Sequence, residues 1–133
     1  MFDNELEKIR LRKAEELLKL QSVQTEIIEI HTYEELTNLS KEHPKKIIII
    51  DFWAIWCGPC KVFTPIFEKL QKEYYKDFIF ARINIDENRE LALEYRVSSI
   101  PTTLFLKAGK VINKIVGTLS YNTFKTVLEK LKG

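Results

Sequence analysis

The stretch Trp53-Ala54-Ile55-Trp56-Cys57-Gly58-Pro59-Cys60-Lys61 contains the only two cysteines of the 133-residue chain. A run of isoleucines precedes it, and a pattern typical of an amphipathic helix follows it. Residues i and i+3 of a helix lie on one face about one turn apart, so Cys57 and Cys60 can form and break a disulfide with little backbone movement. Unpaired backbone N–H groups at a helix N-terminus stabilise a thiolate there. The spacing therefore predicts a dithiol redox site with Cys57 as nucleophile and Cys60 as its resolving partner.

A zinc site is the other interpretation of two cysteines at this spacing. A structural zinc ion would need two further ligands. The only histidines, His31 and His43, both lie upstream at a spacing that matches no usual zinc motif. We therefore expect no metal, and no cofactor other than the Cys57–Cys60 disulfide itself.

Composition and charge indicate one globular domain. The chain is 45% hydrophobic with a formal net charge of +2, so it can bury a full core, and its charge gives no reason to expect nucleic acid or a membrane as partner. The N-terminal residues lack the apolar segment of a signal peptide, and no apolar run approaches membrane-spanning length. A Cys-x-x-Cys pair beside a β–α–β pattern is typical of a thiol that cycles, so we expect a cytoplasmic protein.

Residues 1–24 are predicted to form an amphipathic helical extension to a domain over residues 25–133. No Gly or Pro interrupts the first 21 residues, and their apolar side chains share a narrow face at the helical period. Two interpretations remain open: a helix that packs on its own domain or stays partly solvated, and a helix that docks a partner or a second copy. We expect a monomer, with dimerisation through residues 1–22 as the alternative.

Apolar periodicity and turn signals predict an α/β domain. The predicted strands cover residues 27–30, 45–53, 78–85, 102–107 and 110–116. The predicted helices cover residues 32–42, 59–75 and 88–95, with a last helix after Ser120. Thr32 and Glu35 form a capping-box pattern, Asn88 and Ser120 are expected N-caps, and Pro65 is expected to kink its helix. This order predicts helices on both faces of the sheet, with the cysteines at the carboxyl end of a buried strand.

Four motifs occur in an order that resembles the thioredoxin family, over roughly residues 27–132. They are Asp51-Phe52-Trp53-Ala54, Trp56-Cys57-Gly58-Pro59-Cys60-Lys61, Ile100-Pro101-Thr102 and Gly117. The resemblance implies the thioredoxin fold, a three-layer α/β/α sandwich around a mixed sheet of about five strands. It also implies reduction of disulfides in client proteins. The chain has no phosphate-binding glycine pattern or flavin site, so a separate thioredoxin reductase is expected to restore the dithiol.

The resemblance assigns roles to the residues between and opposite the cysteines. Gly58 and Pro59 are expected to tune the redox poise, and this pair resembles the reductant members of the family. Pro101 is expected to follow a cis peptide bond and to face the two sulfurs. Ile100 beside it is expected to offer backbone groups to an extended client segment.

The residues around Cys57 suggest a docking surface. Trp56 is expected at its rim, whereas Trp53 is expected in the core. Ile55 either joins Trp56, Ile100 and Gly117 in an apolar docking patch or tucks inward. Lys61 either helps to hold Cys57 as a thiolate or is a solvated helix residue.

Asp51 lies in an apolar strand, on the same side as Ile49 and Trp53. Burial raises the pKa of a carboxyl group, which makes Asp51 a candidate proton acceptor for Cys60. The alternative is an aspartate that caps the next turn. Arg82 stands where the family usually has a lysine near this aspartate. Its permanent charge would oppose a raised pKa, unless its side chain points to solvent.

Two other classes of function remain open. One is a disulfide oxidase or isomerase on the same fold, which differs from a reductase in the redox potential of the cysteine pair. The other is a non-catalytic binding subunit of a larger complex, in which the cysteines are dispensable.

Overall fold

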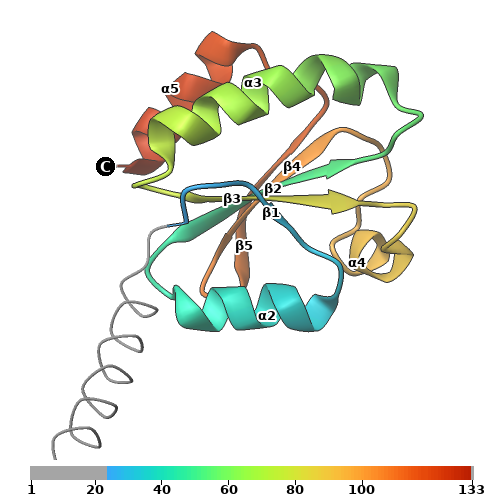
Figure 1. Cartoon of the computed structure of the whole chain (residues 1–133), viewed down its shortest axis with the longest axis horizontal. Helices are drawn as coiled ribbons and strands as arrows, with labels where there is room; N and C mark the ends of the chain where they lie inside the picture. Colours follow the sequence, from blue (N-terminus) through green and yellow to red (C-terminus); the bar gives the residue numbers. More distant parts are fainter. Residues whose placement is uncertain (1–23, 133) are drawn as a thin grey trace, which may run out of the picture.

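The computed structural model describes residues 24–132, so the extension predicted for residues 1–24 lies almost entirely outside the described residues. A five-stranded sheet in the order β1-β3-β2-β4-β5 forms its centre (Figure 1). The strands are β1 (Ile28–Glu29), β2 (Ile47–Trp53), β3 (Ile79–Asn84), β4 (Thr102–Lys107) and β5 (Lys110–Val116). The helices are α2 (Tyr33–Glu42), α3 (Gly58–Tyr74), α4 (Arg89–Glu94) and α5 (Tyr121–Lys132).

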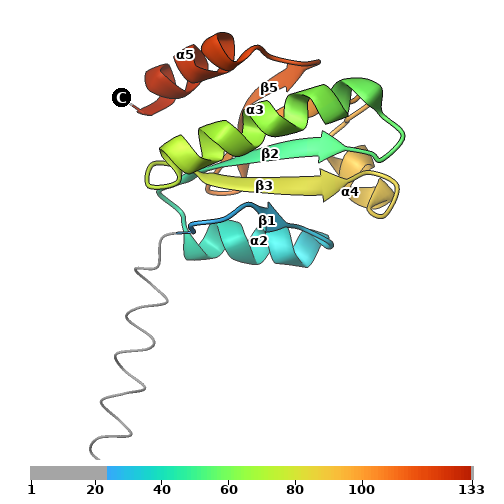
Figure 2. The same ribbon diagram turned by 45° about the horizontal axis from the view of Figure 1, so that its top comes forward.

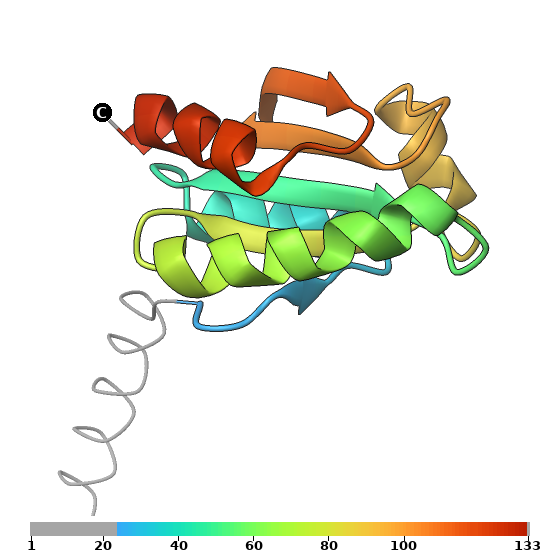
Figure 3. The ribbon, with the colours of Figure 1, turned by 90° about the horizontal axis from the view of Figure 1, so that it is seen from above.

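The sheet is mixed, and helices cover both of its faces. Strands β1 and β2 run parallel to β3, whereas β4 is antiparallel to both β2 and β5. Helices α3 and α5 lie on one face (Figure 3), and α2 and α4 lie on the other (Figure 1). The expected three-layer sandwich is confirmed. No helix within residues 24–132 is long and apolar enough to cross a membrane.

The isoleucine run of β2 contributes to two cores, because successive side chains of a strand point to opposite faces. Ile48, Ile50 and Phe52 pack on the side of α2 and α4, with Leu36 and Leu91. Ile47 and Ile49 pack on the opposite side among the aromatic rings and leucines of α3 and α5, which are Phe63, Phe67, Leu70, Tyr74, Phe124 and Leu128. A strand covered on both faces is apolar throughout, and Asp51 interrupts that pattern.

Short-range polar contacts set the starts of the helices, with two differences from expectation. Thr32 caps α2 through a bond from the Glu35 N–H (3.1 Å), but the Glu35 carboxylate accepts from the His31 N–H (2.7 Å) rather than from the N-cap residue. Ser120 caps α5 through the Thr123 N–H (3.2 Å). Asn88 precedes α4 but makes no side-chain cap, because its amide donates to the Asn84 carbonyl instead (3.1 Å).

Three local features concern the ends and the course of individual strands and helices. The first strand is shorter than predicted, because only Ile28 and Glu29 pair with β3. Ala108 and Gly109 have positive φ values of 50° and 78°, which suits the two-residue turn of the predicted β4–β5 hairpin. Pro65 lies inside α3, and the helix continues past it to Tyr74.

Candidate active site

The carboxyl ends of β2 and β3 lie at one edge of the sheet, where the segment into α3 and the loop before α4 emerge (Figure 2). Cys57 is the N-cap residue of α3, and its sulfur takes the place of a capping oxygen by accepting the Cys60 N–H at 3.2 Å. The two cysteines are joined as a disulfide with a Cα–Cα separation of 5.3 Å. Both are buried, Cys57 at 4% and Cys60 at 2% exposure. The structure thus brings the pair together as the spacing predicted.

The segment around Pro101 lies opposite the cysteines. The Ile100–Pro101 peptide bond is cis, as the resemblance implied, and the Ile100 carbonyl oxygen lies 3.9 Å from Cys57 Sγ. Gly117, at the end of β5, donates its N–H to the Pro101 carbonyl (2.8 Å). Its φ of 94° is in the region that favours glycine. Segments distant in sequence therefore meet at the sulfurs.

Asp51 is fully buried beneath this edge, on the face covered by α3. The Nε of Arg82 lies 3.3 Å from its Oδ2, with 14% of the Arg82 side chain exposed. Arg82 therefore contacts Asp51 rather than pointing to solvent. Burial nevertheless raises the pKa of Asp51 to about 6, because desolvation outweighs the opposing charge and hydrogen bond of Arg82. The alternative role as a turn cap has no support in its hydrogen bonds, since Arg82 is the partner of Oδ2 and Oδ1 is buried without a partner among the described residues.

Arg82 is also held by two other groups. Its Nη2 donates to Thr64 Oγ1 (3.0 Å), and its guanidinium carbon lies 4.3 Å from the centre of the Trp53 ring. Thr64 in turn donates its hydroxyl to the Cys60 carbonyl (2.9 Å). Asp51 is thus connected through Arg82 and Thr64 to the backbone of Cys60. Thr64 is not among the residues predicted from the sequence, because a threonine within a helical pattern gives no indication of such a contact.

Exposed apolar side chains stand next to the cysteines in sequence. Ile55 is 68% exposed and Trp56 is 67% exposed, so the interpretation that Ile55 tucks inward is wrong. Trp53 is partly buried against Ala54 and the cysteines. Val62, in the first turns of α3, is also largely exposed. Lys61 is exposed too, and its N–H donates to the Cys57 carbonyl (3.3 Å) in the first turn of the helix.

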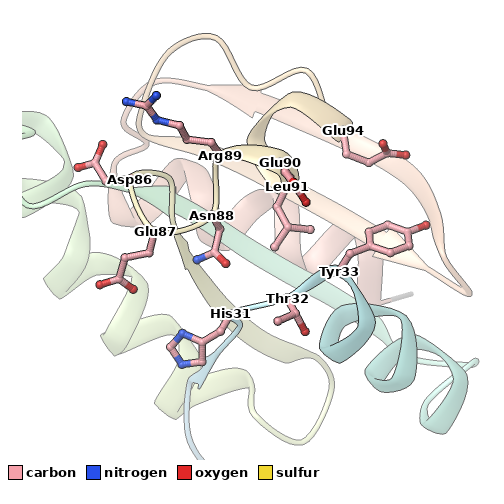
Figure 4. A pocket seen from close by; sticks show the side chains of 10 residues that line it. All are labelled: His31, Thr32, Tyr33, Asp86, Glu87, Asn88, Arg89, Glu90, Leu91 and Glu94. Carbon is pink, nitrogen blue, oxygen red and sulfur yellow. The ribbon is translucent and has the colours of Figure 1, made fainter.

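Trp56 is oriented by an acidic loop that was not among the site residues predicted from the sequence. Its indole Nε1 donates to Asp86 Oδ2 at 2.8 Å. Asp86 follows the carboxyl end of β3, and sites of open α/β sheets lie at that edge. Its position in the chain could therefore have identified Asp86 as a candidate site residue. The same loop borders an open cleft of about 710 Å³, around which Asp86, Glu87, Glu90 and Glu94 are arranged (Figure 4). Neither cysteine lines this cleft.

Comparisons with known proteins identify the family. The family model for thioredoxin matches residues 26–130. The chain belongs to the thioredoxin family. Thioredoxin from Chlorobaculum thiosulfatiphilum is 46% identical over 77 residues, which are 58% of this chain and 71% of that protein. Mitochondrial thioredoxin from Bos taurus is 41% identical over 86 residues, which are 65% of this chain and 52% of that protein.

Solved structures agree with this assignment. Thioredoxin from Malassezia sympodialis superposes with a TM-score of 0.75 at 28% identity, covering 83% of this chain and 94% of that one. A chain from a study of the thiol resolving mechanism in yeast mitochondrial 1-Cys peroxiredoxin via glutathione/thioredoxin systems has a TM-score of 0.70 at 32% identity. It covers 82% of this chain, and the match spans 99% of that chain.

Family membership and the disulfide together establish the class of activity. The protein is a thiol–disulfide oxidoreductase, and its redox group is the Cys57–Cys60 pair. Members of the family need no cofactor beyond this disulfide. Within residues 24–132, no three His, Cys, Asp or Glu side chains are grouped so that they could hold a metal ion.

Proposed function

We propose that the protein reduces disulfides in client proteins, with Cys57 as the attacking thiolate and Cys60 as the resolving thiol. One observation carries this assignment of roles. Cys57 is the N-cap of α3 and its sulfur accepts the Cys60 N–H, whereas Cys60 lies inside the first turn. A sulfur that already accepts a backbone N–H at a positive helix end is favoured as a thiolate.

The reaction then proceeds in two exchanges. The Cys57 thiolate attacks one sulfur of the client disulfide, and the other client sulfur leaves as a thiolate. Cys60 loses its proton and attacks Cys57 Sγ, which forms the Cys57–Cys60 disulfide and releases the second client sulfur. Two electrons pass to the client, and the oxidised pair is the form that the structure contains.

Asp51 is proposed as the acceptor of the Cys60 proton. A carboxyl group with a pKa near 6 is a stronger base than an exposed aspartate, and it still ionises near neutral pH. The connection through Arg82 and Thr64 leads from Asp51 to the backbone of Cys60. Asp51 thus has a pKa suited to accepting a proton near neutral pH, and it lies on the face of the sheet that α3 covers.

The client is proposed to bind as an extended segment along the cis-proline loop. Ile100 is half-buried against the cysteines and would offer its backbone groups to the client. Trp56 and Ile55 supply exposed apolar surface beside Cys57, and the hydrogen bond from the Gly117 N–H to the Pro101 carbonyl holds the loop in place. Gly58, Pro59 and Lys61, which surround the pair in the first turn of α3, are proposed to tune its potential.

The electron donor is proposed to be a separate thioredoxin reductase in a reducing compartment such as the cytoplasm. The study of yeast mitochondrial 1-Cys peroxiredoxin concerns thiol resolution via the glutathione and thioredoxin systems. Peroxidases of that chemistry are therefore one class of client to test for this protein.

A Cys60→Ser variant tests the proposal. Without the resolving thiol, the first exchange stalls as a mixed disulfide on Cys57, so clients and the reductase should be captured together and released by a reductant. A Cys57→Ser/Cys60→Ser variant is the control and should capture nothing. If Cys57 of the single variant remains reactive to a thiol reagent but captures no protein, the reductase role is wrong. A measured potential in the range of oxidising members of this fold would favour an oxidase instead.

We also propose that residues 25–133 form the redox domain and that the protein is a monomer. The family match begins at residue 26, which supports this boundary. After deletion of residues 1–22, the protein should have the mass of a single chain in solution. It should also reduce a model disulfide as fully as the whole chain does. A full-length dimer that becomes a monomer on deletion would instead assign residues 1–22 to dimerisation.

A further inference from the structure

Thr64 uses both hydrogen-bonding functions of its hydroxyl within the protein. It donates to the Cys60 carbonyl at 2.9 Å and accepts from Arg82 Nη2 at 3.0 Å. Arginine is always a donor, so the hydroxyl proton must point to Cys60. The side chain therefore links the first turn of α3 to the guanidinium of β3.

The same guanidinium also contacts Asp51. An arginine and a carboxylate frequently pair through two parallel N–H···O bonds. Here the contact is single, from Nε to Oδ2 at 3.3 Å. The second donor, Nη2, is engaged by Thr64, and Asp51 Oδ1 is buried without a partner among the described residues. The Trp53 ring, 4.3 Å from the guanidinium carbon, further restricts that plane.

We propose that Thr64 is a positioning residue for the redox reaction: by holding Arg82 Nη2 at the Cys60 turn, it keeps Arg82 from pairing with both oxygens of Asp51. A two-bond pair would stabilise the carboxylate more strongly than the single contact does. Asp51 would then be a weaker base. Thr64 thus preserves the basicity of Asp51 through Arg82, without touching Asp51 itself.

The surroundings of Asp51 make Arg82 the group to control. Arg82 from β3 lowers the Asp51 pKa, and the more distant Glu29 from β1 raises it slightly. Strand β4 places the uncharged Thr103 opposite Asp51. From α3, Lys61 is exposed in the first turn and Glu68 lines the same surface hollow as Arg82, whereas the two cysteines do not titrate while they are joined. In the oxidised protein, the Arg82 charge is therefore the charge with the largest effect on the Asp51 pKa.

The test is the titration of Asp51 in the oxidised, full-length protein, followed by carbon-13 NMR of its carboxyl group. Thr64→Val keeps the shape of the side chain but removes the hydroxyl, so Arg82 Nη2 is free to turn to Oδ1. We expect the midpoint to fall by about one pH unit, a tenfold change in the protonation equilibrium. Thr64→Ser retains the hydroxyl and should restore the wild-type midpoint. An unchanged or raised midpoint in Thr64→Val would overturn the proposal.

A matched control separates this effect from loss of a helix threonine. Thr37 in α2 also donates its hydroxyl to the carbonyl four residues earlier, that of Tyr33, at 2.9 Å. Thr37→Val should leave the Asp51 midpoint in place. If Thr37→Val moves it as much as Thr64→Val does, the effect is not specific and the proposal is wrong.

The consequence for turnover rests on the proposed role of Asp51, whereas the titration does not. If Thr64→Val lowers the midpoint but leaves the pH profile of client reduction unchanged, Thr64 positions Arg82 as stated and the proton-transfer role of Asp51 is wrong. If the midpoint and the profile move together, both are supported. The Cys60→Ser capture remains a separate test of the reductase function.

Discussion

Arg82 lies 3.3 Å from Asp51 at Oδ2, and Asp51 still has a pKa of about 6. A cation at this distance stabilises the carboxylate. The raised pKa therefore means that the unfavourable desolvation of the Asp51 carboxylate is larger than its stabilisation by Arg82. The pair therefore does not act as a simple structural ion pair. It leaves a base that ionises near neutral pH beneath the redox-active cysteines.

This balance predicts a pH dependence of stability. Because the folded-state pKa of Asp51 lies above its ordinary value of 3.8, the native protein binds this proton more tightly than the unfolded chain does. The resulting stabilisation is fully present below pH 3.8 and is lost as the pH rises through about 6. It amounts to about 3 kcal/mol. In urea unfolding of the oxidised protein, Asp51→Asn should lack this decline, and parallel curves from pH 4 to pH 8 would contradict the raised pKa.

The proposed proton transfer predicts a kinetic effect of the same substitution. Asn cannot accept the Cys60 proton, so Asp51→Asn should slow reduction of a protein disulfide between about tenfold and a hundredfold at pH 7. The measurement is the initial rate with excess client from pH 6 to pH 9. Asp77→Asn, beyond the C-terminal end of α3, is the control. A rate equal to wild type across this range would remove Asp51 from the mechanism.

Arg82 is predicted to lower the Asp51 pKa, so removing its charge should raise that pKa further. Arg82→Gln should shift the Asp51 titration upward from about 6, by about one unit or more. Arg82→Lys keeps the charge and should shift it less. Carbon-13 NMR of the oxidised protein measures both variants. A downward shift in Arg82→Gln would mean that Arg82 does not stabilise the Asp51 carboxylate.

The exposed apolar residues beside Cys57 are predicted to bind clients. Ile55→Ser removes apolar surface from a side chain that is 68% exposed, so it should raise KM for a protein client a few-fold with little change in kcat or in folding stability. Val111→Ser is the matched control, because Val111 is 49% exposed and lies towards the hairpin end of β5. Equal KM values for the two variants would exclude Ile55 from docking.

Gly117 is predicted to be required by its backbone conformation. A Cβ at this position would meet nothing within 4 Å, but φ is +94°, so Gly117→Ala should cost about 1–2 kcal/mol from strain alone. Urea unfolding of the oxidised protein measures this loss. Gly109→Asn in the hairpin, where φ is +78°, should cost less because asparagine adopts this region more readily. A loss in Gly109→Asn as large as in Gly117→Ala would contradict this explanation.

Local patterns in the amino-acid sequence were enough to predict the strands, the helices and the reactive cysteine pair. The isoleucine run of β2, the helical periods and the Ala108-Gly109 turn are local patterns, and local patterns are set by side-chain period and by backbone sterics. The Cys57–Cys60 spacing acts within one helical turn, so its geometry also follows without the rest of the fold. The resemblance to the family added Pro101 and Gly117.

The contacts between different strands and helices, in contrast, follow from the three-dimensional fold. Whether Arg82 reaches Asp51, whether Ile55 points outward, and that Thr64 joins Arg82 to the Cys60 backbone all depend on how β2, β3 and α3 are placed in space. The pKa of Asp51 depends on the same placement, because it is the difference between a burial cost and the attraction of one nearby charge. Neither contribution is encoded in the residues next to Asp51 in the chain, which is why the sequence suggested Asp51 as a candidate proton acceptor without predicting its surroundings.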